Sequence, residues 1–171
     1  AGEYILSIEN IQQEVLDKAV LPLKFNDLFG QTTNGSDYSD LNGNSAEGSI
    51  QNLSIAGTVT AASAYCNGRT AARNAKFLIY NSSRVLVATS DALSISTTAG
   101  WKNFTISGSL ASGNYYLCVI VDNIWRMYES AVAGKNICFD YDNDYTTPAN
   151  PITWDTEDGW GDHVANTYAT F

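Results

Sequence analysis

Three aspartates alternate with other residues in the stretch DYDND, at Asp140, Asp142 and Asp144. Carboxylate oxygens are the ligands that Ca²⁺ prefers, and the opening of an EF-hand loop shows the same alternation. The loop glycine of an EF-hand is missing here, and an apolar residue stands where its bidentate Glu would fall. The pattern excludes an EF-hand and leaves two alternatives, a different surface calcium site or a solvated acidic loop.

A second group of residues that could do chemistry lies in the segment WDTEDGW, which interrupts the rhythm of the strand-like runs before it. Aromatic rings can stack on the apolar faces of sugars, and neighbouring carboxylates can accept hydrogen bonds from sugar hydroxyls. We therefore expect an exposed recognition or contact surface that consists of Trp154, Asp155, Asp158 and Trp160. Packing of a long loop against the domain, or a subunit contact, would explain the same residues.

Catalytic motifs do not stand out in this sequence. It has one histidine, His163, and it contains no G-x-S-x-G elbow, no H-E-x-x-H pair and no glycine-rich phosphate loop. Acidic residues are plentiful, but no pair identifies itself as the acid and base of a glycosidase. The sequence predicts a protein that is not an enzyme and that has no cofactor, apart from the Ca²⁺ considered above.

The three cysteines, Cys66, Cys118 and Cys138, are an odd number, so they cannot all pair within the chain. Cys66 and Cys118 lie in strand-like runs and could form one cross-sheet disulfide in an oxidising compartment. The alternative is three small buried side chains in a reducing one. The absence of a CxxC pair argues against a zinc site.

Charge and hydropathy exclude further classes. Acidic residues outnumber basic ones 18 to 9, which gives a net charge of -9, and no Lys/Arg cluster is present. Such a chain repels phosphate backbones, so nucleic acid is not an expected partner. The longest apolar run, YYLCVIV, is far shorter than the roughly 20 residues that a membrane-spanning helix needs, so membrane insertion is not expected either.

The elements that must position these residues are short strands. Between residues 55 and 122, runs rich in β-branched and aromatic residues alternate with Gly, Asn and Ser clusters, which predicts a β-sandwich or barrel. Asn81 to Ser83 are expected to form a hairpin turn. Trp101, Phe104 and Ile106 are expected to anchor the core.

The first 30 residues have a different character. Apolar residues recur at helical spacing and then alternate, which predicts a helix over about 8–20 followed by an extended segment. We interpret 1–30 as an assembly arm, 31–48 as a polar linker or loop, and 49–171 as the sandwich. The arm residues expected to make subunit contacts are Ile8, Ile11, Val15, Leu21, Leu23 and Phe25.

Five motifs occur in a fixed order along the chain: AGTVTAASAYCNG, KFLIYNSSRVLVATSD, TTAGWKNFTISGSLASGNYYLCVIVDN, WRMYES and HVANTYATF. Together, over about residues 45–171, they resemble a jelly-roll β-sandwich module of phage tail and head fibres and of bacterial or archaeal surface proteins. The resemblance implies an all-β jelly roll with a binding or building role on a virion or extracellular surface, and it supplies no cofactor or catalytic residues.

Two functions are consistent with these observations. The first is a non-catalytic structural subunit of an extracellular or virion assembly, such as a fibre, appendage or capsid decoration, which forms a homo-oligomer or polymer through its N-terminal arm. The second is a carbohydrate-binding module or adhesin domain with a cell-surface glycan as its partner.

Overall fold

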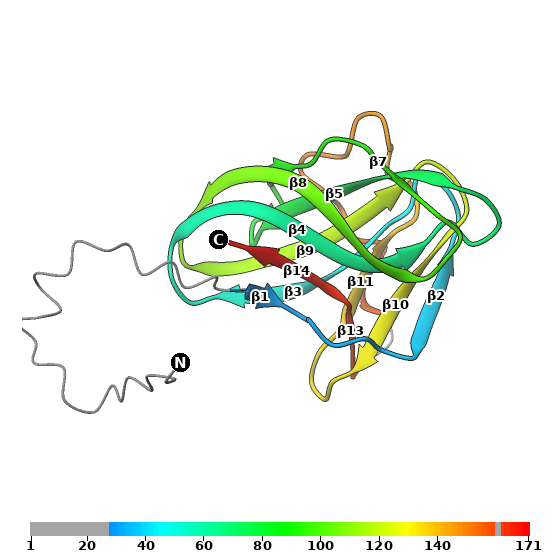
Figure 1. The fold of residues 1–171 in the computed structure, drawn as a ribbon. Helices are drawn as coiled ribbons and strands as arrows, with labels where there is room; N and C mark the ends of the chain where they lie inside the picture. The colour runs from blue at the N-terminus through cyan, green and yellow to red at the C-terminus, as the bar shows by residue number, and fades with distance from the viewer. Residues whose placement is uncertain (1–27, 160–161) are drawn as a thin grey trace, which may run out of the picture.

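The computed structural model describes residues 28–159 and 162–171, and these residues form two antiparallel β-sheets that pack face to face (Figure 1). The described residues contain strands and no helix, which confirms the prediction of an all-β sandwich. The expected arm residues, from Ile8 to Phe25, lie outside the described part of the chain, and so does the predicted helix. Within that part, no helix is long and apolar enough to cross a membrane.

Each sheet has seven strands within the described residues. Sheet A consists of β1 (Leu28–Gly30), β2 (Asp37–Leu41), β4 (Gly57–Asn67), β8 (Gly100–Leu110), β10 (Trp125–Ala131), β13 (His163–Ala165) and β14 (Thr167–Thr170). Sheet B consists of β3 (Ala46–Leu53), β5 (Arg73–Asn81), β6 (Leu86–Thr89), β7 (Leu93–Ile95), β9 (Gly113–Val121), β11 (Ile137–Asp140) and β12 (Thr156–Gly159). The first and last strands, β1 and β14, lie side by side.

The core lies between the two sheets because alternate residues of each strand face inward. In β9, Tyr115, Leu117, Val119 and Val121 belong to this core. Of the residues between them, Cys118 and Ile120 are also buried and Tyr116 is partly buried, because sheet B is covered on its outer face as well. This two-sided burial explains why β9 is a nearly continuous apolar run.

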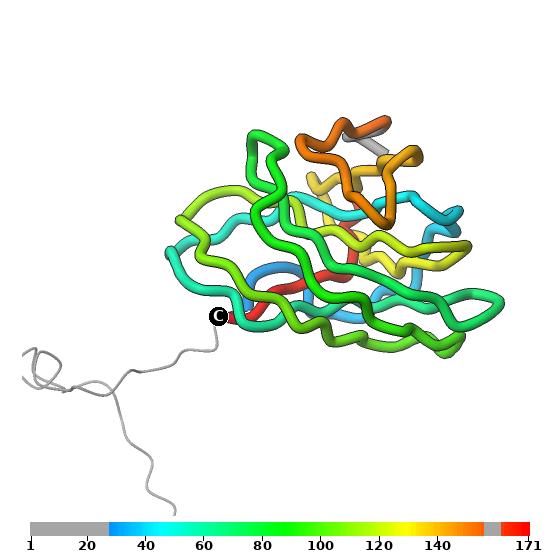
Figure 2. Tube along the Cα trace, turned by 90° about the horizontal axis from the view of Figure 1, so that it is seen from above, coloured from blue at the N-terminus to red at the C-terminus, as the bar shows by residue number. Residues whose placement is uncertain are grey.

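The segment after β11 covers the outer face of sheet B (Figure 2). Ile152 and Trp154 come from this segment and pack against Leu78, Tyr80 and Ile120, which point outward from β5 and β9. A second, smaller hydrophobic cluster results. The long acidic and aromatic stretch before the last strands is therefore a packed layer over sheet B rather than a free loop.

Residues 31–48 differ from the predicted polar linker. They contain β2, which pairs with β10, and the first residues of β3. In β2 the inward residues Ser39 and Leu41 are buried, whereas Tyr38 and Asp40 are exposed. This alternation is too short and too polar to distinguish from a loop in the sequence, and pairing with β10 is what makes the segment a strand. β1 belongs to the sandwich as well, because Leu28 pairs with Thr170.

The hairpin expected at Asn81 is confirmed. The Asn81 side-chain Oδ1 accepts hydrogen bonds from the backbone N–H groups of Ser83 (2.9 Å) and Val85 (3.0 Å), and β6 returns along β5. An Asn side chain that replaces a backbone acceptor in this way is typical of a tight turn.

All three cysteines are buried, and no disulfide joins any two of them in the structure. Burial raises the pKa of the Cys66 thiol to about 12. Cys118 and Cys138 lie on the outer side of sheet B on either side of Gly48, to which both are paired. A Cβ at Gly48 would lie 2.5 Å from the Cys118 Sγ, so a side chain is sterically excluded there.

Candidate functional site: an aromatic face on sheet A

Five strands of sheet A each place one aromatic ring on the outer face of the sheet. The alternation of each strand determines this, because the flanking residues point into the core: Met127 and Glu129, on either side of Tyr128, are fully buried. Tyr38 is 44% exposed and the other four rings are half-buried. Neither hydrophobic cluster of the described residues includes these rings. The aromatic face consists of Tyr38, Tyr65, Trp101, Tyr128 and Tyr168.

The five rings form one continuous series of contacts. The ring centroids of Tyr38 and Tyr128 are 6.1 Å apart, those of Tyr128 and Tyr65 are 5.1 Å apart, and those of Tyr65 and Trp101 are 5.5 Å apart. Trp101 continues the series to Tyr168 at 5.0 Å. The ring planes of the Tyr38–Tyr128 pair are tilted by 59°, and the other three pairs have the edge-to-face geometry that aromatic pairs prefer.

One end of the aromatic face carries a fixed guanidinium group. The Arg126 guanidinium carbon lies 3.7 Å from the centroid of the Tyr38 ring. Arg126 also donates two hydrogen bonds to Asp40, at 2.7 and 3.0 Å, and Arg69 lies 3.2 Å from the same carboxylate. The hydrogen bond from Arg126 lowers the pKa of Asp40, so this carboxylate stays charged and bridges the two guanidinium groups. The cation holds Tyr38 in place without making the face strongly basic.

The other end of the aromatic face is polar and uncharged. Ser63 Oγ donates to Asn103 Oδ1 at 2.8 Å, and Thr60 Oγ1 donates to the Thr170 carbonyl at 3.2 Å. Thr60 and Asn103 are exposed, so their remaining hydrogen-bonding groups are open to a ligand. The sheet therefore presents stacking surfaces next to amide and hydroxyl groups.

The expected role of Trp101 in the core is wrong, although Phe104 and Ile106 are buried as predicted. Trp101 is the Cα partner of Tyr65 and lies on the opposite side of β8 from these two residues. The spacing of residues 101, 104 and 106 contained the signal, because an odd step separates Trp101 from the two even positions.

The three aspartates expected to bind calcium do not converge. Asp140 is buried and accepts hydrogen bonds from Asn143 Nδ2 at 2.8 Å and from the Asp142 backbone N–H at 3.2 Å. Asp142 and Asp144 are exposed, and Asp144 accepts from Thr146. Within residues 28–159 and 162–171, no group of three His, Cys, Asp or Glu side chains could hold a metal ion. The carboxylates of Asp140 and Asp144 order local turns instead.

Trp154 does not lie on an exposed surface, contrary to its expected role. It is 7% exposed, and its ring centroid lies 5.2 Å from that of Tyr116 and 6.1 Å from that of Tyr80. Asp155 is exposed and accepts a hydrogen bond from the Tyr141 backbone at 2.7 Å. The Asp158 side chain and Trp160 lie outside the described residues. Trp154 is thus not part of an exposed aromatic surface, and the rings of the aromatic face lie on sheet A.

A pair of carboxyl groups lies between the two sheets, where the sequence did not predict one. Glu47 of β3 and Glu129 of β10 have no exposed surface, and their carboxyl groups are close enough to interact electrostatically. Ser39 Oγ donates to Glu129 Oε1, while both Glu47 oxygens and Glu129 Oε2 have no hydrogen-bond partner among the described residues. Burial raises the pKa of both groups, and the adjacent Glu129 raises that of Glu47 further.

His163 lies close to this carboxyl pair, with its Nε2 3.2 Å from Asp37 Oδ2. An acid pair and a histidine are the components of general acid–base catalysis. The two glutamates are completely buried, however, so a substrate has no access to them in this structure. The alternation of Glu129 with the apolar residues Trp125 and Met127 is the signal in the sequence that could have placed it in the interior.

No model of a known protein family matches the chain, and a search of curated protein sequences also gave no match.

Proposed function

We propose that the protein is a non-catalytic carbohydrate-binding module with a jelly-roll type of sandwich, and that the aromatic face of sheet A binds a glycan. The observation that supports this function is the series of five rings across the outer face, next to uncharged amide and hydroxyl groups. Apolar sugar faces stack on aromatic rings, and the sugar hydroxyls need such polar partners.

The length of the series favours a chain of sugars over a single sugar. The contacts run from Tyr38 on β2 to Tyr168 on β14, and they cross β10, β4 and β8. Edge-to-face contacts fix the orientation of each ring without covering both of its faces. A surface whose rings are already fixed loses little side-chain entropy when it binds an extended ligand.

The charges favour a neutral glycan. Arg126 and Arg69 share the carboxylate of Asp40, and the chain as a whole has a net charge of -9. A polyanionic sugar chain would be repelled by such a protein. We therefore expect binding to change little between low and high salt, because few ion pairs form in the complex.

A glycan array followed by calorimetry with the best neutral ligand tests this function. Trp101→Ala and Tyr65→Ala each remove a ring from the middle of the aromatic face, and each should weaken binding by about tenfold, as stacking contacts do elsewhere. Tyr141→Ala is the matched control, because this residue is 50% exposed but lies outside the aromatic face.

Two results would count against glycan binding at this face. One is an array without any bound glycan. The other is a bound glycan whose affinity is the same for the Trp101→Ala variant and for the Tyr141→Ala control.

We further propose a second candidate, a structural subunit of an extracellular or virion assembly that forms a homo-oligomer through the arm. The observation that favours it concerns β1, the first described strand, at the end of the predicted arm. β1 pairs only with β14 among the described strands, so its other edge is open, and Leu28 and Ile55 are 52% and 66% exposed. An open edge beside apolar side chains is a site for strand addition by a neighbouring chain. Measurement of the oligomeric state tests this function.

A further inference from the structure

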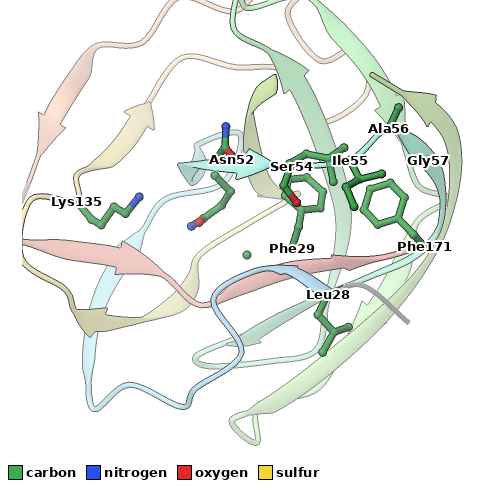
Figure 3. Close-up of a pocket in the computed structure, with 12 residues that line it drawn as sticks. Leu28, Phe29, Asn52, Ser54, Ile55, Ala56, Gly57, Lys135 and Phe171 are labelled. Atoms are coloured by element: carbon green, nitrogen blue, oxygen red, sulfur yellow. The ribbon is translucent and has the colours of Figure 1, made fainter. Parts of the chain in front are cut away.

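A cavity of about 480 Å³ opens at the edge of the sandwich, away from the aromatic face. It lies between β1 of sheet A and the end of β3 in sheet B, and the β3–β4 connection and the C-terminal residue close it (Figure 3). Its volume is within the range of pockets that bind small organic molecules. None of the five aromatic-face residues lines it.

The walls of this cavity divide into an apolar part and a cationic part. Phe29, Leu53, Ile55 and Phe171 supply the apolar surface, while Lys135 extends into the cavity from the opposite side (Figure 3). An amphiphilic molecule, which has an apolar end and a charged end, would match these two parts of the cavity.

Lys135 has no charged partner in this cavity. The twelve lining residues include no Asp or Glu, and none of the ion pairs or hydrogen bonds of the described residues uses the Lys135 side-chain ammonium. Lys135 as a residue is half-buried, so part of its aliphatic stem is covered by the protein. An unpaired cation on one wall of a pocket in an otherwise acidic protein attracts an anionic group.

One amide group lies close to the cationic end, because the register that pairs Ser49 with Ile137 places Gln51 opposite Lys135. Gln51 lines the cavity and donates one hydrogen bond from Nε2 to Ser49 Oγ, so its second N–H is available to a ligand oxygen. The next residue, Asn52, points to the opposite face of sheet B and donates to Asn114 there. A carboxylate with two acceptor oxygens fits the combination of the Lys135 ammonium and the Gln51 amide.

We propose that this cavity binds a small organic carboxylate with an apolar tail, with the carboxylate at Lys135 and the tail against Ile55 and Phe171. Charge complementarity identifies the head group, and the apolar wall identifies the tail. The proposal is independent of the glycan-binding function, because the two sites share no residue.

Octanoate, below its micellar concentration, is a suitable probe for the full chain, and 1-octanol is its uncharged counterpart. Calorimetry should show saturable octanoate binding to the unaltered protein. Lys135→Met keeps the apolar stem and removes the charge, and it should weaken octanoate binding about fivefold or more, while Lys135→Arg should retain it. Lys102→Met is the control, because Lys102 is held by Ser96 and Thr98 and does not line the cavity.

Binding of 1-octanol should be weaker than that of octanoate and should not change in Lys135→Met. The proposal is overturned if octanoate does not bind saturably to the full chain, which is also the result expected if residues before Leu28 fill the cavity. Equal octanoate affinity in Lys135→Met and Lys102→Met would overturn it as well.

Discussion

Glu47 and Glu129 place two acidic groups where a sandwich normally has only apolar side chains. Their oxygens face each other without a cation, and Ser39 provides a single hydroxyl donor. Two ionised carboxylates in contact would repel each other in a medium that solvates neither, so at least one must keep its proton in the folded state. The pair resembles the shared-proton carboxyl pairs of some enzymes in its chemistry, but its complete burial gives it a structural role.

This pair predicts an unusual pH dependence of stability. The folded pKa values are raised above the unfolded values, so the pair favours folding below about pH 4.5, and this contribution is lost as the pH rises toward the folded pKa values. Asp40, whose pKa is lowered, has the opposite effect at low pH. Glu47→Gln removes one titrating group from the pair. We expect its unfolding free energy to decline less between about pH 5 and pH 8, by about 1 kcal/mol or more, than that of the unaltered protein.

Urea unfolding at several pH values measures this difference, with Asp142→Asn as the control because Asp142 is exposed. Parallel pH profiles for Glu47→Gln and the unaltered protein would show that the pair does not titrate as proposed.

At the scale of elements, the outer faces of the two sheets differ in whether another segment covers them. The segment after β11 covers sheet B with Ile152 and Trp154, whereas the outer face of sheet A presents its aromatic rings to solvent. A sheet face that remains uncovered and aromatic is a candidate interaction surface, while a covered one contributes to stability. The proposed binding surface on sheet A is therefore separate from the face of sheet B that contributes to stability.

Trp154 provides a test of the covering layer. Because its ring is 7% exposed and contacts Tyr80 and Tyr116, Trp154→Ala should reduce the unfolding free energy by about 2 to 4 kcal/mol. Tyr141→Ala, in the same segment but exposed, should cost less than about 1 kcal/mol. Denaturant unfolding at neutral pH compares the two variants. Similar small losses in both would mean that the segment does not pack on sheet B in solution.

At the scale of the whole molecule, the open edge of β1 and the arm before it concern assembly. Phe29 lies in the core and Leu28 pairs with Thr170, so a truncation that tests the arm must end before Leu28. Proteins that assemble by strand addition lose the assembly, and keep the fold, when the donated segment is removed.

Deletion of residues 1–27 should therefore leave a folded sandwich that is monomeric by size-exclusion chromatography with light scattering, if the arm drives assembly. Circular dichroism of the same sample checks the fold. An oligomer of unchanged size in the truncated chain would contradict the assembly role, and so would a monomeric full-length chain.

Much of the architecture can be predicted from the sequence, because strand formation and turns depend on neighbouring residues. Runs of β-branched and aromatic residues between turn clusters indicate a sandwich. Asn81 indicates a hairpin, because an Asn side chain can accept hydrogen bonds from the backbone of the turn that follows it. β2 was not predicted, since its sequence DYSDL is too short and too polar to give a strand signal without β10 beside it. The sequence by itself thus determined the all-β class and most of the strands.

Only the tertiary structure decided which side chains lie at a surface. Whether an aromatic residue is buried depends on whether another element covers its face of the sheet, and that element comes from a distant part of the chain. Trp154 is buried because it packs onto Tyr80, and Trp101 is half-exposed because the outer face of sheet A presents it to solvent beside Tyr65. The pairing of Glu47 with Glu129 likewise depends on two sheets meeting face to face, which no local pattern records.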